Sequence, residues 1–152
     1  MTLANPSSHS LRTGRRSEAQ RIYLITIKTH RRIPFFNDLA TGRILIQALQ
    51  QTSGAADTLC FVVMPDHLHW LMQLKEEAGL SATVQKAKSI TTRKLHVRHQ
   101  HPEQIWQRGF HDRALRSEDD IKSVARYIIA NPVRAGLVRS VVDYSLWDAA
   151  WV

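Results

Sequence analysis

The sequence predicts an α+β domain in which helices pack on a mostly antiparallel sheet. Two-residue alternation marks the strands, helical spacing of apolar residues marks the segments between them, and one turn is short enough to make a hairpin. The order of strand, helix, hairpin, helix, strand and helix is typical of this fold class. We expect a basic segment over residues 1–20 that becomes ordered only on a partner, and a single domain over residues 21–152.

The first half of the chain predicts a strand, a helix and a hairpin. β-Branched and aromatic residues alternate over residues 21–29, which predicts the first strand. A helix is expected over residues 38–52, where an aspartate at the first position is a suitable N-cap. Residues 58–64 and 67–74 predict two further strands, and the Pro-Asp pair at 65–66 predicts the tight turn that joins them.

The second half predicts two helices around a fourth strand. Apolar residues recur at helical intervals between 80 and 99, and Ser81 is the expected N-cap of this helix. Residues 107–115 predict a strand, weakened by an internal glycine. Ser117, followed by acidic residues in the first turn, begins a last long helix that runs towards residues 131–132.

Positive charge is concentrated at the N-terminus. Residues 1–32 hold seven basic side chains and one acidic side chain, in a chain whose net charge is +8. An excess of this size attracts a polyanion, and nucleic acid is the commonest one. A solvated basic tail is the alternative interpretation. A second basic cluster on the helix over residues 80–99 favours a continuous basic surface; its members are Lys86, Lys88, Arg93, Lys94 and Arg98.

Cysteine use and hydropathy argue against a disulfide framework and a membrane span. The single cysteine, Cys60, lies within an apolar run, so we expect a buried and reduced thiol. No stretch reaches the roughly 20 apolar residues that cross a bilayer, and the N-terminus lacks the apolar part of a signal peptide. We therefore expect a cytoplasmic, nucleoid-associated protein with no membrane partner.

His67 and His69 are the first candidate site residues. Because side chains alternate along a strand, the two imidazoles share one face, while Leu68 and Trp70 share the other. Neutral imidazole binds transition metals well, and two ligands on one rigid strand need little rearrangement. Two histidines still make an incomplete metal site, so a further ligand has to come from elsewhere in the chain.

Tyr127 and Asn131 are candidates on the last predicted helix. An advance of about 100° per residue places Tyr127 roughly 120° from the centre of the apolar stripe, and therefore outside the main core. Asn131 follows four residues later on the same polar strip. If this helix lies over the histidine face, Asn131 can supply an oxygen to a metal and Tyr127 can point at the same place. The alternative is a tyrosine that only covers a helix edge, with its hydroxyl in water.

These motifs resemble those of the REP-associated tyrosine transposases, bacterial relatives of the single-tyrosine insertion-sequence transposases in the HUH nuclease superfamily. The resemblance rests on residues 63–70 (VMPDHLHW) and 125–138 (ARYIIANPVRAGLV). It extends through residues 106–112 and 143–147, and covers nearly all of residues 11–151. It implies the ferredoxin-like or RRM-like fold of HUH nucleases.

The resemblance also implies a reaction. Family members cut and rejoin single-stranded DNA through a tyrosine that forms a 5′-phosphotyrosine intermediate. Carried over by position, Tyr127 would be the nucleophile, and the ligands of Mg²⁺ or Mn²⁺ would be His67, His69 and Asn131. Such an ion polarises the scissile phosphate, which helps a phenol that is a weak nucleophile at neutral pH. The implied partner is a REP-like DNA hairpin with a single-stranded flank, bound by a monomer or a homodimer.

Basic and aromatic residues are the expected DNA contacts. The basic ones are Arg12, Arg15, Arg16, Arg93, Lys94 and Arg98. The first three lie in a segment that resembles the family's DNA-contacting N-terminus, and the last three could follow the hairpin backbone. Phe35, Phe36 and Trp106 could stack on unpaired bases, but packing is the favoured interpretation for each.

Other functions and sites stay open as alternatives. The same sheet and basic surface would suit a catalytically silent DNA- or RNA-binding domain, and the two histidines would suit a replication or conjugation nickase, for which the chain is short. A zinc site at His96, His99 and His101 is disfavoured because its spacing is unfamiliar and no cysteine lies nearby. Tyr23, in a core strand, and Tyr144, in a closing segment without polar companions, are disfavoured as nucleophiles.

Overall fold

One antiparallel sheet is the frame of the molecule. The computed structural model describes residues 21–99 and 103–150. Within these residues, the strands are β1 Ile22–Lys28, β2 Ala56–Met64, β3 His67–Leu74, β4 His111–Leu115 and β5 Trp147–Ala149. They lie in the order β4-β1-β3-β2-β5, and each is antiparallel to its neighbours.

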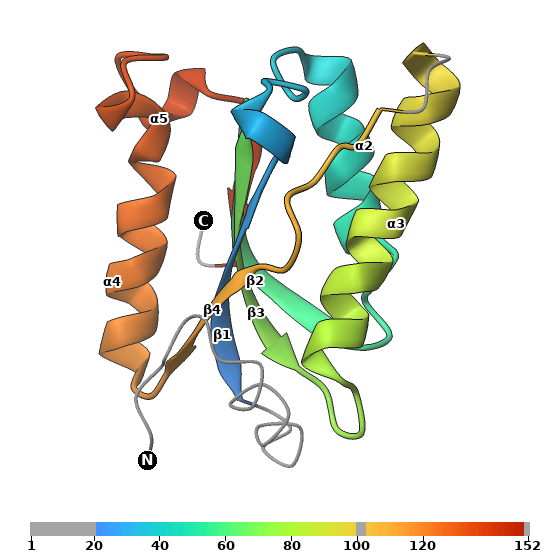
Figure 1. The fold of residues 1–152 in the computed structure, drawn as a ribbon. Helices are drawn as coiled ribbons and strands as arrows, with labels where there is room; N and C mark the ends of the chain where they lie inside the picture. The colour runs from blue at the N-terminus through green and yellow to red at the C-terminus, as the bar shows by residue number, and fades with distance from the viewer. Residues whose placement is uncertain (1–20, 100–102, 151–152) are drawn as a thin grey trace.

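Helices cover both faces of this sheet (Figure 1). The long ones are α2 Leu39–Gln50, α3 Leu80–His99 and α4 Glu118–Ile129, and the short ones are α5 Asn131–Arg134 and the 3-10 turns η1 His30–Arg32 and η2 Val141–Asp143. Helices α2 and α3 lie on one face, and α4 lies on the other (Figure 1). The predicted α+β class, with helices packed on an antiparallel sheet, is confirmed.

The alternation of β3 divides the core into two clusters. Leu68 and Trp70 point towards α2 and α3, where they join the larger cluster together with Leu45 and Val84. Leu71 points the other way and joins a smaller cluster that includes residues of α4. His67 and His69 have the same parity as Leu71 in this strand, so the histidine face is the face that α4 covers.

The N-terminal caps of α2 and α4 agree with the sequence. Asp38 accepts a hydrogen bond from the backbone N–H of Thr41 at 2.8 Å, and Ser117 accepts one from the backbone N–H of Asp120 at 3.1 Å. Each cap satisfies an N–H group that has no partner inside the helix. The expected capping role of Ser81 is wrong, because α3 begins at Leu80 and Ser81 lies inside its first turn.

The last helix is shorter than predicted. Helix α4 ends at Ile129, and a separate short helix, α5, begins at Asn131. Pro132 explains the break, because proline has no backbone N–H and its ring clashes with the carbonyl group four residues earlier. Ala130 between the two helices keeps right-handed dihedral angles, with φ −77° and ψ −5°.

Several strand boundaries also differ from the expectation. Strand β2 begins at Ala56 instead of residue 58, and β5 was not predicted. Strand β4 begins at His111 instead of residue 107, because the chain turns at Gly109, whose φ is +72°. Such a φ favours glycine.

The burial of the cysteine thiol and the hydropathy of the described helices agree with the predictions from the sequence. Cys60 is free and buried, and burial raises its pKa to about 12. No helix in the described part of the chain has the length and apolar character that crossing a membrane requires. The division at residue 20 stays a prediction, because residues 1–20 lie outside the described part.

Candidate active site

His67 and His69 lie at the start of β3, directly after the hairpin turn. Their ring centroids are 4.9 Å apart and the ring planes are nearly perpendicular, at 82°. Strand β3 is hydrogen-bonded on both sides, to β1 and to β2. Opposite the two histidines in β1 stand Lys28 and Thr26. The sheet therefore holds two imidazoles side by side on the face that α4 covers.

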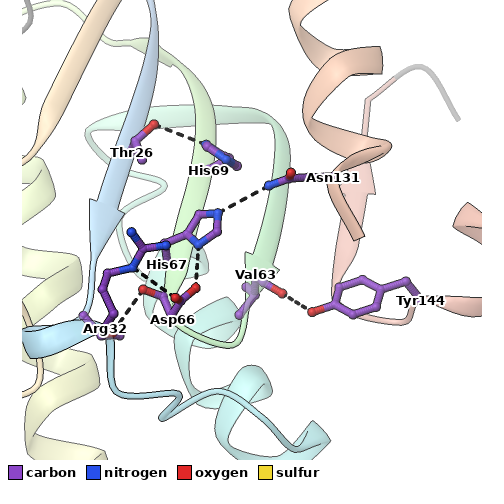
Figure 2. Close-up of polar contacts among 9 residues, drawn as sticks. Thr26, Arg32, Val63, Asp66, His67, His69, Asn131 and Tyr144 are labelled. Carbon is purple, nitrogen blue, oxygen red and sulfur yellow. Dashed lines mark hydrogen bonds and ion pairs between the residues drawn. The ribbon is translucent and has the colours of Figure 1, made fainter. Parts of the chain in front are cut away.

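A chain of polar contacts fixes the ring of His67 (Figure 2). Its Nδ1 lies 2.8 Å from Oδ1 of Asp66, and Oδ2 of Asp66 accepts a hydrogen bond from Nε of Arg32 at 3.0 Å. A carboxylate beside Nδ1 favours the tautomer that carries its proton there. The lone pair of Nε2 is then directed away from Asp66, and this is the nitrogen that faces Asn131.

His69 is held by Thr26 and by burial. Its Nδ1 lies 3.2 Å from the hydroxyl of Thr26 (Figure 2). Burial, and then the charges of His67, Arg134 and Lys28, lower the pKa of His69 to about 4. Burial also lowers the pKa of His67, although the carboxylate of Asp66 opposes the shift. Both imidazoles are therefore neutral at neutral pH, which is the form that binds a metal.

Asn131, the first residue of α5, contacts His67, the first residue of β3. Its Nδ2 donates a hydrogen bond to Nε2 of His67 at 3.3 Å (Figure 2), and its Oδ1 accepts one from Nη2 of Arg134 at 3.2 Å. The sequence predicted that Asn131 can supply an oxygen to a metal if the last helix lies over the histidine face, whereas in the structure its amide nitrogen faces His67. Helix α4 does lie there, because its buried Ala125 and Ile128 pack in the smaller cluster.

Tyr127 lies at the exposed side of α4. Its side chain is 65% exposed, so the prediction that it points away from the core is confirmed. The guanidinium carbon of Arg134 lies 3.7 Å from the centroid of its ring. Arg134 and Asn131 thus connect the tyrosine to His67 through three successive contacts. The exposure suits a nucleophile and also suits a tyrosine that covers a helix edge, so the catalytic role stays a prediction.

The side chains present suit a metal ion with nitrogen and oxygen ligands. In the part of the chain that the structure describes, no three His, Cys, Asp or Glu side chains gather in a way that could hold an ion. An ion bound by His67 and His69 would therefore need a different third ligand. The amide of Asn131 is beside them, and amide oxygens are ligands for hard divalent cations.

The three expected DNA contacts that the structure describes lie away from this site. Arg93, Lys94 and Arg98 are exposed on α3, which lies on the opposite face of the sheet from the histidines (Figure 1). Lys88 is not part of their surface, because it is buried and donates hydrogen bonds to the carbonyl groups of Gln107 and Gly109. The other three expected contacts, Arg12, Arg15 and Arg16, lie outside the described residues.

The aromatic residues proposed as base-stacking platforms belong to the core. Phe36 and Trp106 are buried and stack on each other, with ring centroids 5.4 Å apart. Phe35 packs partly against the same cluster. Packing was the favoured interpretation, and it is confirmed.

The alternative nucleophiles are less exposed than Tyr127. Tyr23 is fully buried. Tyr144 does have a polar companion, contrary to the expectation, because its hydroxyl donates to the backbone carbonyl of Val63 (Figure 2). Burial raises the pKa of Tyr144 to about 12. Both tyrosines are therefore poor nucleophiles.

The zinc site at His96, His99 and His101, which the sequence disfavours, is described only in part. Nε2 of His96 lies 2.6 Å from the carbonyl oxygen of Glu103, and His101 is outside the described residues.

The sequence reasoning missed three residues that support the site. Asp66 was assigned only to the turn, although it directly precedes His67 and could have been considered as its partner. Arg134 follows Tyr127 by seven residues, which is two helical turns, so helical periodicity could have found it. No sequence pattern pointed to Thr26, because its position opposite His69 depends on which strands pair.

Comparisons with known proteins agree with the observed fold. The family described as IS200-like transposases matches residues 19–131, which include all four candidate residues. The chain is similar to a Haemophilus influenzae protein whose name assigns it to the REP-associated tyrosine transposases, at 33% identity over 98 residues. That match covers 58% of this chain and 56% of the relative.

Another relative and a solved structure extend the comparison. The REP-associated tyrosine transposase of Escherichia coli K12 is 31% identical over 85 residues, which are 55% of this chain and 48% of that protein. The chain thus spans about half the length of the curated relatives it matches. A REP-associated tyrosine transposase solved with a REP hairpin has a TM-score of 0.73 and 23% identity, over 85% of this chain and 76% of that one. This likeness shows a shared fold.

Proposed function

This chain belongs to the IS200-like transposase family, and from that premise we propose that it cuts and rejoins single-stranded DNA beside REP-like hairpins. One observation carries the proposal at the level of residues. The contact between Asn131 and His67 joins the helical half of the site to the strand half, at the end of α4 where Tyr127 is exposed.

Tyr127 is the proposed nucleophile. Its hydroxyl oxygen attacks the phosphorus atom, a bond to a 5′-phosphate forms, and the bond from phosphorus to the 3′-oxygen breaks. The phenol proton passes to solvent, and the leaving 3′-oxygen takes up a proton to become a free hydroxyl. Because the phosphotyrosine keeps the energy of the broken bond, a 3′-hydroxyl can reverse the step and rejoin strands without ATP.

His67, His69 and Asn131 are the proposed ligands of Mg²⁺ or Mn²⁺. When bound, such an ion polarises the scissile phosphate and neutralises charge on its oxygens. The chain's own contribution is to prepare the ligands. Burial keeps both imidazoles neutral, and Asp66 turns the lone pair of Nε2 of His67 towards Asn131.

Hairpin DNA is the proposed substrate. The support is the similar protein that was solved bound to a REP hairpin, together with the net charge of +8 in this chain. Phosphate contacts by basic side chains supply most of the affinity of such complexes. The proposed place of action is the cytoplasm, at the nucleoid, where the DNA is.

A covalent-adduct experiment tests the proposal. The protein is incubated with Mn²⁺ and a labelled REP-like hairpin that carries a single-stranded flank, and the denatured mixture is separated on a gel. We expect a labelled protein band that disappears in Tyr127→Phe and persists in Tyr144→Phe. A protein that binds the hairpin but gives no adduct would be the catalytically silent binding domain instead.

A further inference from the structure

Arg134 contacts both helical residues of the candidate site. It is the last residue of α5, and its guanidinium carbon lies 3.7 Å from the ring centroid of Tyr127. Its Nη2 also donates a hydrogen bond to Oδ1 of Asn131 at 3.2 Å. The right-handed backbone at Ala130 keeps α5 close to the helical register of α4, so residues 127 and 134 still face the same side. One side chain thus touches the proposed nucleophile and the proposed ligand.

The partners of Asn131 determine how its amide is turned. Arg134 can only donate hydrogen bonds, so the atom beside it is the amide oxygen. The amide nitrogen then faces Nε2 of His67, whose other ring nitrogen is next to the carboxylate of Asp66. Each donor in this series of hydrogen bonds, from Arg134 to Asp66, meets an acceptor. The orientation of the amide is therefore consistent with all of these contacts.

This orientation is incompatible with metal binding by Asn131. An amide NH₂ group is a donor without a lone pair for a cation, and it is the group that faces His67. For Oδ1 to reach an ion on Nε2 of His67, the amide must rotate by a half-turn about its last bond. The NH₂ group would then face the guanidinium, where two donors oppose each other. Arg134 and a cation therefore compete for one oxygen atom.

We propose that Arg134 is a positioning residue that holds Oδ1 of Asn131 until a divalent cation takes that oxygen and releases the guanidinium. The released group remains beside Tyr127, where its planar donors can pair with phosphate oxygens of the DNA strand. Cation binding and phosphate binding would then be coupled through this residue. The inference rests on the proposed function, because it takes the metal ligands from there.

Titration with Mn²⁺ in the absence of DNA tests the competition. Isothermal titration calorimetry measures the dissociation constant of Mn²⁺ for the full chain and its variants. We expect Arg134→Met to bind Mn²⁺ about two- to fivefold more tightly than the parent protein, because one hydrogen bond from a charged donor no longer opposes the rotation. Arg126→Met is the matched control, since Arg126 is exposed on α4 beside Tyr127 and leaves the contacts of Arg134 in place. It should change the constant by less.

A double variant separates competition for the oxygen from a simple loss of positive charge. In an Asn131→Ala background, Arg134→Met should tighten Mn²⁺ binding clearly less than in the parent protein, because the contested oxygen is gone and only the loss of positive charge remains. If the tightening persists there at full size, the effect is electrostatic and the inference is wrong. Equal or weaker binding in Arg134→Met alone would also overturn it.

Magnetic resonance of the amide gives an independent readout. The chain has three asparagines, Asn5, Asn37 and Asn131, so side-chain ¹⁵N labelling of asparagine yields few signals, and Asn131→Asp identifies the relevant pair. Addition of Mg²⁺ should shift that pair, and Arg134→Met should shift it already without Mg²⁺. An Asn131 signal that ignores both changes would refute the coupling. None of these measurements uses DNA or Tyr127, so the adduct experiment reports on the proposed function separately.

Discussion

The two halves of the candidate site are built in different ways. The strand half, His67 and His69, sits in β3, which buries five of its eight residues and is paired on both sides. The helical half sits at the junction of α4 and α5, where α4 buries only Ala125 and Ile128. The two histidine ligands are thus rigid, and the helical half, which carries Asn131 and the nucleophile, is adjustable. A site of this kind can keep an ion in place while Tyr127 moves between attack and release.

The polar partners of the two halves show the same contrast. His67 and His69 each have a fixed neighbour within the sheet or its turn, namely Asp66 and Thr26. Tyr127 is 65% exposed, and Arg134 packs on its ring. Loss of a histidine from the strand half should therefore abolish cleavage outright, whereas a change at a helical residue other than Tyr127 should alter how well the two halves meet.

The largest expected effect is the loss of cleavage in the strand half. His67→Ala and His69→Ala should each abolish adduct formation, at least about a thousandfold, because the charge growing on the phosphate is no longer neutralised. Hairpin affinity should change little, because it rests on phosphate contacts. Gel assays measure the adduct and fluorescence anisotropy measures the affinity. Equal loss of both would mean that the histidines are structural.

Core substitutions test the difference in rigidity. Trp70→Ala removes a fully buried side chain of the larger cluster and should lower the free energy of unfolding by about 3–5 kcal/mol. Ile128→Ala, in the smaller cluster under α4, should cost about 2–4 kcal/mol. Urea denaturation measures both.

Ile128→Ala further distinguishes the halves by function. Because it loosens α4 and leaves β3 intact, adduct formation should fall while Mn²⁺ binding by the histidines stays within a few fold. If Mn²⁺ binding falls as far as the adduct does, the strand half is not independent of the helix and the comparison fails.

Removal of the Asp66 carboxylate should have a smaller effect. Asp66→Asn leaves the turn in place but weakens the hold on Nδ1 of His67, so Mn²⁺ affinity should fall about 10- to 100-fold, as for other partners of metal-binding histidines. Calorimetry measures the change. Asp57→Asn, at an exposed position of β2, is the matched control and should bind Mn²⁺ like the parent protein.

The smallest expected effect is on the pH dependence of stability. Burial depresses the pKa of His69 from 6.5 to about 4, so between these values the unfolded chain binds the proton and the folded chain does not. The contribution of His69 to stability is therefore fully present above pH 6.5 and is lost as the pH is lowered towards 4. Urea denaturation of the metal-free protein should show this slope. His69→Gln should flatten this slope.

The sequence predicted what depends on local patterns. Alternation identified the face of β3 that carries the histidines, helical spacing placed Tyr127 outside the core, and residue preferences identified the caps at Asp38 and Ser117. Each of these features is set by residues a few positions apart, so a single segment contains the information.

Features that depend on the assembled fold were not predicted. Strand β5 has three residues, which are too few for a recognisable strand pattern. Its pairing with β2 determines its position. Lys88 looked like part of a basic surface, but the loop at residues 107–109 covers it and accepts its hydrogen bonds. The contact between Arg134 and Asn131 lies in α5, a separate short helix that begins where the last long helix was expected to end.

The central claim is that Tyr127 and an ion held by His67 and His69 meet at one place. The chain has three tyrosines, so ¹⁹F resonance of 3-fluorotyrosine, assigned with Tyr23→Phe and Tyr144→Phe, can report on each. Broadening by bound Mn²⁺ falls steeply with distance, and Tyr23, in the larger cluster on the other face of the sheet, is the internal control. We predict that Mn²⁺ broadens Tyr127 far more than Tyr23, and that His67→Ala removes the effect. A Tyr127 signal that stays sharp while the histidines bind Mn²⁺ would contradict the account.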